Sequence, residues 1–257
     1  SEKIIHHKEI GDCKYYIDPY IGCSFSCHYC FSQNDFHSIH EESLYIHGDF
    51  ETRLRNELKN IEPQKIFIGF ATDPYQPIED ELKQTKTTLE VLDESGFNVS
   101  IVTKSHLILR DKHIIKRMAG SSVGTSVAFR EESIRNLFEP NTPDNEYRFQ
   151  LLKEFKNDKI HTFILICPII PFYTDIEYLI AKSAPVANDI WFYRLILNNP
   201  DDINWKNLSK ILDSIYPGFS EENADIFFNS SNPYWDELRK RLNIYQNSTK
   251  LNLKIFI

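Results

Sequence analysis

The sequence predicts an α/β protein in which a β-strand followed by an α-helix repeats about six times. Several short apolar runs lack the polar alternation of a one-sided sheet, which is typical of buried parallel strands. The polar segments between them carry apolar residues at helical spacing, and each is long enough for a crossover helix. Parallel strands with right-handed crossovers form an open doubly wound sheet or a partial barrel. In both architectures ligands bind at the carboxyl ends of the strands.

Six segments supply the strands of this series, and a seventh is expected at the end of the chain. The last residues, Leu251 to Ile257, alternate well enough between apolar and polar side chains for an edge strand. The six strands of the βα series are expected at Tyr15 to Tyr20, Lys65 to Ala71, Asn98 to Thr103, Ser122 to Phe129, His161 to Ile170 and Asp189 to Leu197.

Helices are expected between these strands and after the last one. No repeat beyond the βα unit and no linker is found, so residues 1–257 are expected to form one domain, with a barrel at about 15–197 and a C-terminal extension at about 198–257. Helical spacing appears at Leu82, Leu89 and Leu92, at Leu151, Leu152 and Phe155, and in two packing helices after the last strand, one with Trp205, Leu208, Ile211, Leu212 and Ile215, the other with Trp235, Leu238, Leu242 and Tyr245.

Composition and cysteine usage predict a globular cytoplasmic protein. Hydrophobic residues make up 41% of the chain, and the 18 Phe and 13 Tyr can bury a large area. No apolar run approaches the roughly 20 residues that span a bilayer, and Ser1 to Ile10 lacks the apolar core of a secretory signal. Three of the five cysteines lie within eight residues, which suits a metal or cluster site in a reducing compartment. We therefore expect no membrane span and no structural disulfide.

The charge of the chain disfavours a nucleic-acid partner. The formal net charge is −8 at pH 7, whereas tight binding to a polyanion draws on many Lys and Arg contacts to phosphate. A small molecule or a peptide is therefore the preferred substrate class, and nucleic acid stays a disfavoured alternative.

The most specific motif is a cluster of three cysteines. Cys23, Cys27 and Cys30 have the spacing C-x3-C-x2-C directly after the first expected strand, where a loop can wrap a metal cluster. A four-iron, four-sulfur cluster has four iron corners, so three thiolates leave one iron open to a small ligand. The spacing therefore favours a [4Fe-4S] cluster with a vacant coordination site.

Zinc is the inorganic alternative, because C-x2-C pairs are common in structural zinc sites with four Cys or His ligands. Only His28, Cys13 or Cys167 can complete such a site. A structural zinc usually holds together a small domain that does not fold without it, whereas this chain has enough apolar residues to form a core without zinc. A non-catalytic zinc-binding module is thus the weaker alternative.

The cysteine loop and several later segments resemble the radical S-adenosylmethionine (SAM) superfamily, and within it the subgroup related to spore photoproduct lyase. The aromatic Tyr29 immediately before the third cysteine is similar to the superfamily signature. The similarity is ordered along residues 15 to about 197. Its matching segments are residues 18–23, 71–79, 103–105 and 109–111, Thr125-Ser126, Glu139-Pro140, Arg148 and residues 168–171.

The resemblance implies a partial (β/α)6 radical SAM barrel with the cluster at its open top. SAM would chelate the vacant iron through its amino and carboxylate groups. An electron from a donor such as flavodoxin or ferredoxin would then break its sulfur–carbon bond, and the 5′-deoxyadenosyl radical would abstract hydrogen from a small-molecule or peptide substrate. The barrel would exclude water and competing hydrogen donors.

The resemblance also implies a set of cofactor-binding residues. Tyr29 would lie near the SAM adenine, and Thr72, Asp73, Lys104 and Ser126 follow or end strands, so they can point into one mouth. A lysine offers a point charge for the SAM carboxylate, and hydroxyls offer short hydrogen bonds. As alternatives, Tyr29 is a core aromatic residue and Asp73 caps the turn that follows it.

Residues that act on the substrate are less defined. In the spore lyase a cysteine just after the second strand returns a hydrogen atom to the product radical, and this position is Ala71 here. Lyase activity on thymine lesions is therefore the less favoured alternative. Cys167 and Cys13 are candidates for a hydrogen donor or an extra ligand, although a buried free cysteine is more often a small apolar residue. Arg194 is expected either to bind an anionic substrate group or to be a paired structural arginine.

Overall fold

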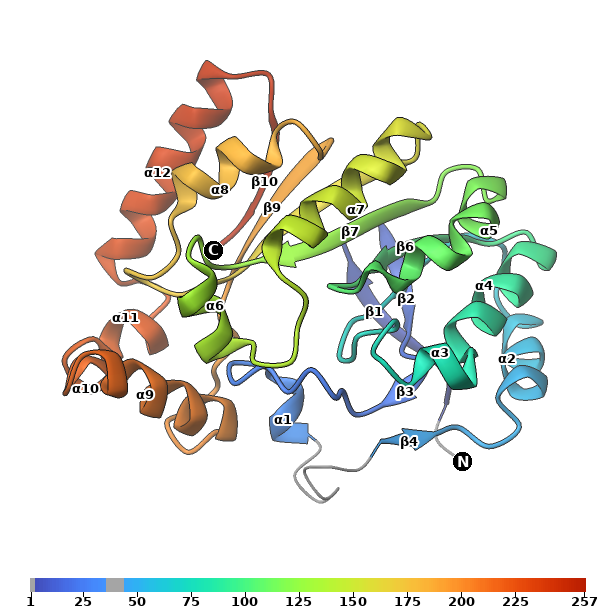
Figure 1. The fold of residues 1–257 in the computed structure, drawn as a ribbon, viewed down its shortest axis with the longest axis horizontal. Helices are drawn as coiled ribbons and strands as arrows, with labels where there is room; N and C mark the ends of the chain where they lie inside the picture. The colour runs from blue at the N-terminus through green and yellow to red at the C-terminus, as the bar shows by residue number, and fades with distance from the viewer. Residues whose placement is uncertain (1–2, 36–43) are drawn as a thin grey trace.

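The computed structural model describes residues 3–35 and 44–257, and its core is one mixed sheet (Figure 1). Eight strands lie in the order β1-β2-β5-β6-β7-β8-β9-β10. β1 runs antiparallel to β2, and every other neighbouring pair is parallel. The strands are β1 Ile5–Ile10, β2 Cys13–Ile17, β5 Lys65–Ile68, β6 Asn98–Val102, β7 Ser122–Val127, β8 His161–Ile169, β9 Asp189–Arg194 and β10 Asn252–Phe256, and a separate ribbon pairs β3 Tyr20–Ile21 with β4 Tyr45–Ile46.

The parallel series β2, β5, β6, β7, β8 and β9 confirms the predicted fold class, a partial α/β barrel. Each expected strand is present but ends earlier than predicted. The first one ends at Ile17 because Asp18 and Pro19 form a turn, and proline has no amide hydrogen to continue the ladder. The expected edge strand is β10, which pairs in parallel with β9. β1 was not expected, since its solvent-facing side chains are polar.

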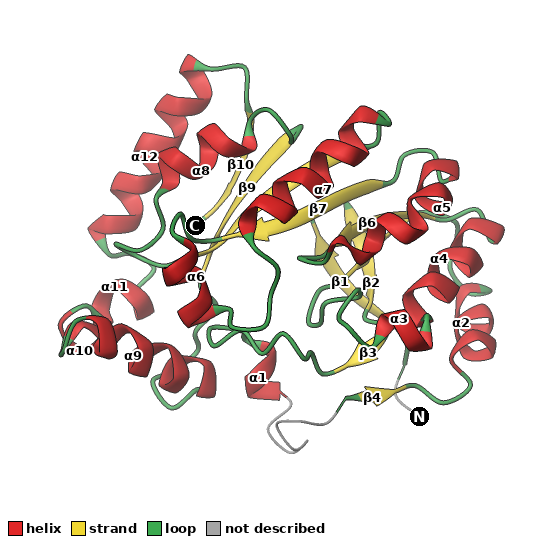
Figure 2. Cartoon of the chain, viewed as in Figure 1, coloured by secondary structure: helices red, strands yellow, loops and turns green. Residues whose placement is uncertain are grey.

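Helices cover the outer face of the sheet, as Figures 1 and 2 show for α4, α7, α8 and α12, which pack on strands. Leu82 departs from its predicted helix: it ends the short α3 and is exposed, because Lys83 has a left-handed backbone (φ 55) that separates α3 from α4. The helices are α1 Ser32–Asp35, α2 Phe50–Leu58, α3 Glu79–Leu82, α4 Gln84–Glu94, α5 Lys112–Arg117, α6 Glu132–Phe138, α7 Asn145–Asn157, α8 Ile176–Ser183, α9 Ile203–Ile215, α10 Phe219–Glu222, α11 Ala224–Phe228 and α12 Pro233–Ser248, with a 3-10 turn at His106–Asp111.

Buried apolar side chains form two clusters. The larger lies between the sheet and its helices and includes Leu89, Leu92, Leu151 and Trp235. The smaller cluster joins the cysteine loop to the C-terminal helices: Phe25, Cys27, Tyr29, Ala128, Phe129, Phe138, Ile170, Leu195, Trp205, Leu208, Leu212 and Phe227.

The second cluster gives the C-terminal extension a place next to the cysteine loop. The two packing helices predicted from Trp205 and Trp235 are α9 and α12, and α9 belongs to this smaller cluster. None of the helices in the described part of the chain is long and apolar enough to cross a membrane. The single-domain organisation stays a prediction.

Candidate cofactor site

A cavity of about 1020 Å³ lies beneath the cysteine loop and reaches into the open barrel. Residues of six parallel strands, β5 to β10, contribute to its wall. Among the residues that line it are those predicted from the sequence to bind the cluster and SAM: Cys23, Cys27, Tyr29, Cys30, Thr72, Asp73, Lys104 and Ser126. Side chains far apart in the sequence are thus brought together at the strand ends, as parallel βα topology requires.

The cysteine loop is a series of tight turns fixed by its neighbours. The Ser26 amide donates to the Cys23 carbonyl (3.3 Å), and Ser26 has a left-handed backbone (φ 48). The fully buried Gln76 holds the start of the loop, since its Nε2 donates to the Gly22 carbonyl (3.0 Å) and its Oε1 accepts from the Ser24 amide (2.8 Å). Gln76 had no predicted role, because a glutamine in a turn carries no local signal of what it will contact.

The three thiols fit a cluster better than a single zinc ion. Within residues 3–35 and 44–257, no three His, Cys, Asp or Glu side chains are gathered to hold one metal ion. Zinc needs its sulfur ligands at about 2.3 Å from one atom, whereas a four-iron cluster takes each thiolate at a separate iron. The three thiols that line the cavity therefore fit the separate irons of a cluster better than one zinc ion.

Burial disfavours free thiolates in this loop. It raises the pKa of Cys23 above the usual range and that of Cys27 to about 12, although the nearby Lys104 charge opposes the shift at Cys27. Without bound metal these two residues are neutral thiols. Binding of a cluster by these residues would therefore release their protons, as metal binding to cysteine generally does.

Asp73 caps the turn that follows it. Its carboxylate accepts hydrogen bonds from the Thr103 hydroxyl (2.6 Å) and the Lys104 amide (2.8 Å), and also from the Tyr75 amide (2.9 Å). It therefore joins the ends of β5 and β6. The Thr72 hydroxyl donates to the Tyr20 carbonyl (3.3 Å), which leaves its oxygen lone pairs for a ligand.

Lys104 brings a positive charge to the cavity that no carboxylate in the described residues pairs with directly. Burial lowers the pKa of this half-buried lysine, but the negative charges of Cys27, where that thiol is ionised, and of Glu139 outweigh burial and hold the pKa above its usual value. The ammonium group stays charged. Ser126, at the end of β7, lines the same wall, and its carbonyl accepts from Arg148 Nη1 (3.0 Å).

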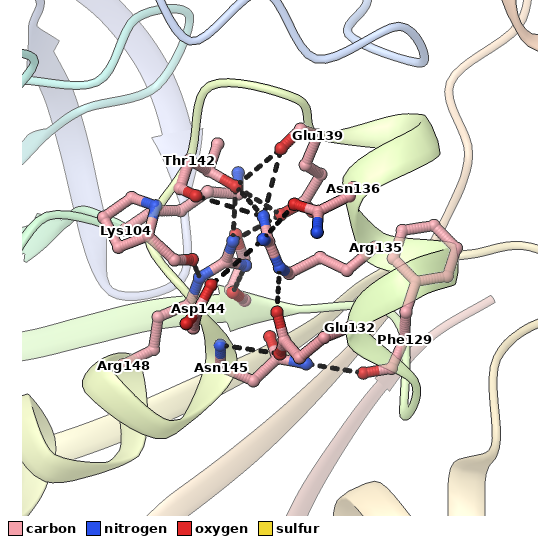
Figure 3. A network of polar contacts seen from close by, with 12 residues as sticks. Lys104, Phe129, Glu132, Arg135, Asn136, Glu139, Thr142, Asp144, Asn145 and Arg148 are labelled. Carbon is pink, nitrogen blue, oxygen red and sulfur yellow. Dashed lines mark hydrogen bonds and ion pairs between the residues drawn. The ribbon is translucent and has the colours of Figure 1, made fainter.

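A buried polar network supports this wall (Figure 3). Glu139 and Arg148 form an ion pair in which both side chains are fully buried. Thr142 bonds both of them, and Arg135 donates to the Glu139 carbonyl oxygen (3.0 Å). Burial alone would raise the pKa of Glu139, but Arg148, Lys104 and the Tyr29 hydrogen bond outweigh it and lower the pKa to about 2.

Tyr29 joins this network to the cysteine loop. Its ring is 7% exposed and its hydroxyl donates to Glu139. Tyr29 thus lies both in the cavity wall and in the smaller apolar cluster, and its contact with the SAM adenine stays a prediction. Glu139 and Arg148 carried no predicted role, because the pairing of two helices is decided only in three dimensions.

The three candidate substrate residues are placed differently. Cys167, at the end of β8, lines the cavity, and burial raises its pKa to about 12. Cys13 lies in β2 beside Asp12 (Sγ to Oδ1 3.7 Å), away from the cavity wall. Arg194 lines the cavity and stacks over the Trp235 ring at 4.9 Å, with no carboxylate partner in the described chain.

Ala71 lies in the cavity wall, at the position where the spore lyase has its cysteine according to the sequence resemblance. Its amide donates to Asp18 Oδ2 (3.0 Å), and the Phe70 amide donates to Oδ1 of the same carboxylate (2.9 Å). Asp18 therefore fixes the turn that presents Ala71, a role that the sequence did not indicate.

The fold is shared with solved radical SAM structures. A spore photoproduct lyase variant with bound AdoMet and dinucleoside spore photoproduct superposes with a TM-score of 0.59 and 17% identity, over 80% of this chain and 62% of that one. SuiB of Streptococcus suis bound to S-adenosylmethionine gives 0.60 and 14%, over 93% and 49%. The chain therefore has the fold of these radical SAM structures, as the sequence resemblance implied.

The chain belongs to the family of the uncharacterized protein MJ0683 of Methanocaldococcus jannaschii. The two are 32% identical over 199 residues, 75% of this chain and 74% of that protein. The uncharacterized protein Rv2578c of Mycobacterium tuberculosis is 29% identical over 178 residues, and the match spans about half (51%) of its length. A radical SAM Nα-GlyT isomerase of Pseudomonas phage M6 is 22% identical over 67% of this chain and 37% of that protein. No family model matches the chain.

Proposed function

We propose that Cys23, Cys27 and Cys30 hold a [4Fe-4S] cluster, and that the protein uses it with SAM to abstract hydrogen from a small-molecule or peptide substrate. When bound, the reduced cluster would supply the electron that cleaves SAM to a 5′-deoxyadenosyl radical. The observation that carries the proposal is that three thiols and Lys104, a lysine with no carboxylate partner among the described residues, line one cavity. A donor such as flavodoxin or ferredoxin and a cytoplasmic location are part of the proposal.

Different residues of the cavity would bind different parts of SAM. Lys104 would attract the SAM carboxylate as a point charge, and the hydroxyls of Thr72 and Ser126 would bond the polar groups of the nucleoside or amino acid part. Asp73 would act through the turn it caps, because its carboxylate already accepts three hydrogen bonds. The cavity wall is closed by apolar side chains such as Trp191, which exclude water from the reacting groups.

The size and lining of the cavity support a second ligand beside SAM. Its volume of about 1020 Å³ is at the upper end of the roughly 300–1,000 Å³ of typical ligand pockets. Arg194 is proposed to bind an anionic group of the substrate, and Cys167 to serve as a hydrogen donor. Among structural neighbours, SuiB has been solved with its precursor peptide SuiA, and spore photoproduct lyase with a dinucleoside lesion. The net charge of −8 and the alanine at position 71 favour the peptide or small molecule.

The test is anaerobic reconstitution with iron and sulfide, followed by reduction in the presence of SAM. Wild type and Cys13→Ala are expected to bind iron, to absorb visible light and to release 5′-deoxyadenosine. Cys27→Ala is expected to lose most of the iron and all of the nucleoside product. Cys13→Ala is the matched control, because it removes a buried cysteine that lies outside the cavity.

Two results would contradict the proposal. Equal yields of 5′-deoxyadenosine from wild type and Cys27→Ala would show that the cysteine loop takes no part in SAM cleavage. A colourless protein that binds zinc and forms no nucleoside under reduction would instead support the non-catalytic zinc module.

A further inference from the structure

Tyr29 is held at both ends by residues from distant parts of the chain. Its hydroxyl donates to the Glu139 carboxylate, directly after α6. Its backbone carbonyl accepts a hydrogen bond of 3.3 Å from Nδ2 of Asn204, in the first turn of α9. Two separate elements therefore grip the residue that precedes the third cysteine.

The grip from Asn204 is part of a closed set of hydrogen bonds. Asn204 is 0% exposed, and its Nδ2 also donates to the Ile196 carbonyl (2.9 Å), while its Oδ1 accepts from Asn34 Nδ2 (3.1 Å). Asn34 Oδ1 in turn accepts from the amides of Ile203 (3.0 Å) and Asn204 (3.2 Å). A buried amide whose bonds are all made holds its position, because breaking any of them leaves an unpaired polar group. These bonds fasten α9 to α1, which follows the cysteine loop.

The position of Glu139, which accepts the Tyr29 hydrogen bond, is as firmly held as that of Asn204. Glu139 and its partner Arg148 are both fully buried, so neither charge can leave the other without a large desolvation cost (Figure 3). A second link comes from the His28 amide, which donates to the Phe138 carbonyl at 2.9 Å. The end of α6 thus holds two consecutive residues of the loop.

We propose that Glu139 and Asn204 are positioning residues that clamp Tyr29 and so hold the three-cysteine loop in the conformation that receives the cluster. The inference rests on the proposed function. A cluster held by three side chains lacks the fourth attachment that would order its loop, so the order must come from the protein. The left-handed Ser26 (φ 48) supports this, because strained backbone persists only where its surroundings over-determine it.

The test compares Tyr29→Phe with the matched variant Tyr75→Phe in the iron-free chain of residues 1–257. Tyr75 is also buried and its hydroxyl also donates to a carboxylate, Asp111 Oδ2 at 3.1 Å, which is not one of the residues that hold the loop. Hydrogen–deuterium exchange is measured by mass spectrometry on peptides that cover residues 24–33. Tyr29→Phe is expected to speed exchange there about tenfold, which corresponds to the loss of one hydrogen bond to a charged group. Tyr75→Phe is expected to leave the exchange rate of these peptides unchanged. Asn204→Ala is expected to act as Tyr29→Phe does.

Exchange at wild-type rates in the loop of Tyr29→Phe would overturn the proposal, as would a loss of protection spread evenly over the sheet. A spectroscopic readout separates positioning from stability: after reconstitution, the electron paramagnetic resonance of the reduced cluster is expected to change in Tyr29→Phe and not in Tyr75→Phe. If wild type takes up no iron, the proposed function fails, while the exchange comparison still decides whether the clamp holds the loop.

Discussion

At the scale of single residues, the site depends on charges placed where water is excluded. Glu139 and Arg148 neutralise each other in the cavity wall, whereas Lys104 has no carboxylate partner among the described residues. A buried ion pair contributes little net stability compared with apolar residues, but removing one partner leaves an uncompensated charge. The paired charges are therefore structural, and the unpaired one is available to a ligand.

Replacing Glu139 is expected to destabilise the protein in a pH-dependent way. Glu139→Gln leaves the Arg148 charge buried alone and should lower the free energy of unfolding at pH 7 by about 3–5 kcal/mol. The native pKa of about 2 lies below the ordinary 4.5, so this stabilisation is complete above the unfolded-state pKa and is lost as the pH falls toward the native value. Urea denaturation at neutral pH and at about pH 3 should show that the difference in unfolding free energy between wild type and Glu139→Gln becomes smaller at the lower pH. The exposed Glu146→Gln serves as control, and a gap independent of pH would contradict the prediction.

Replacing Lys104 is expected to weaken SAM binding without unfolding the protein. Lys104→Gln removes a charged partner whose bond to a carboxylate is worth about 1.5–3 kcal/mol, so the dissociation constant should rise at least tenfold. Equilibrium dialysis of reconstituted protein with labelled SAM measures it. Lys153→Gln, an exposed lysine on α7, should bind as wild type does. Equal affinity in the Lys104 variant would exclude the lysine from the SAM site.

At the scale of elements, short segments after the strands shape the cavity. Gln76 fastens the start of the cysteine loop, and Asp73 ties the end of β5 to that of β6. Inside the barrel, neighbouring strands alternate large and small side chains: the Phe163 ring of β8 lies over Gly124 of β7. Close packing of this kind leaves no room for added atoms.

A methyl group at Gly124 is expected to disturb the barrel floor. A Cβ built there would lie 2.4 Å from the Phe163 ring, within the sheet. Gly124→Ala should therefore destabilise the protein by about 1–3 kcal/mol through overpacking, as measured by thermal unfolding. Gly48→Ala, where a Cβ meets nothing within 4 Å, is the matched control. An unchanged melting temperature for Gly124→Ala would mean that Phe163 moves aside without cost.

At the scale of the whole molecule, the C-terminal extension is joined to the barrel through the smaller apolar cluster. Trp205 of α9 packs on Phe227 and Phe228 (ring centroids 5.1 and 4.9 Å), and the same cluster contains Phe25 and Tyr29 of the cysteine loop. Extension and cofactor site therefore share a core.

The shared core predicts one cooperative unfolding transition for barrel and extension. Far-ultraviolet circular dichroism and tryptophan fluorescence should give coincident melting curves, because Trp191 reports on the barrel and Trp205 on the extension. Trp205→Ala should lower the free energy of unfolding by about 3–5 kcal/mol and shift both curves together. Two separate transitions would show that the extension folds independently.

What the sequence by itself determined is the class of the protein. The period of the hydrophobic residues predicts strands and helices because the backbone repeat is local. The spacing of Cys23, Cys27 and Cys30 predicts a cluster loop because its proposed ligands are neighbours in the chain. These patterns predicted the partial barrel, the cysteine site and the position of Lys104 at the cavity. The ends of strands were less well predicted, since a turn such as Asp18-Pro19 interrupts an apolar run.

Only the tertiary structure decided which polar groups meet. The clamp of Glu139 and Asn204 on Tyr29, the Gln76 contact with the loop and the separation of Cys13 from the cavity all depend on distances between segments far apart in sequence. A buried hydrogen bond is specified by the geometry of both partners, and single residues such as glutamine or asparagine carry no periodic signal of it. The sequence therefore predicted which residues gather at the cavity, and the fold decided which polar contacts hold them in place.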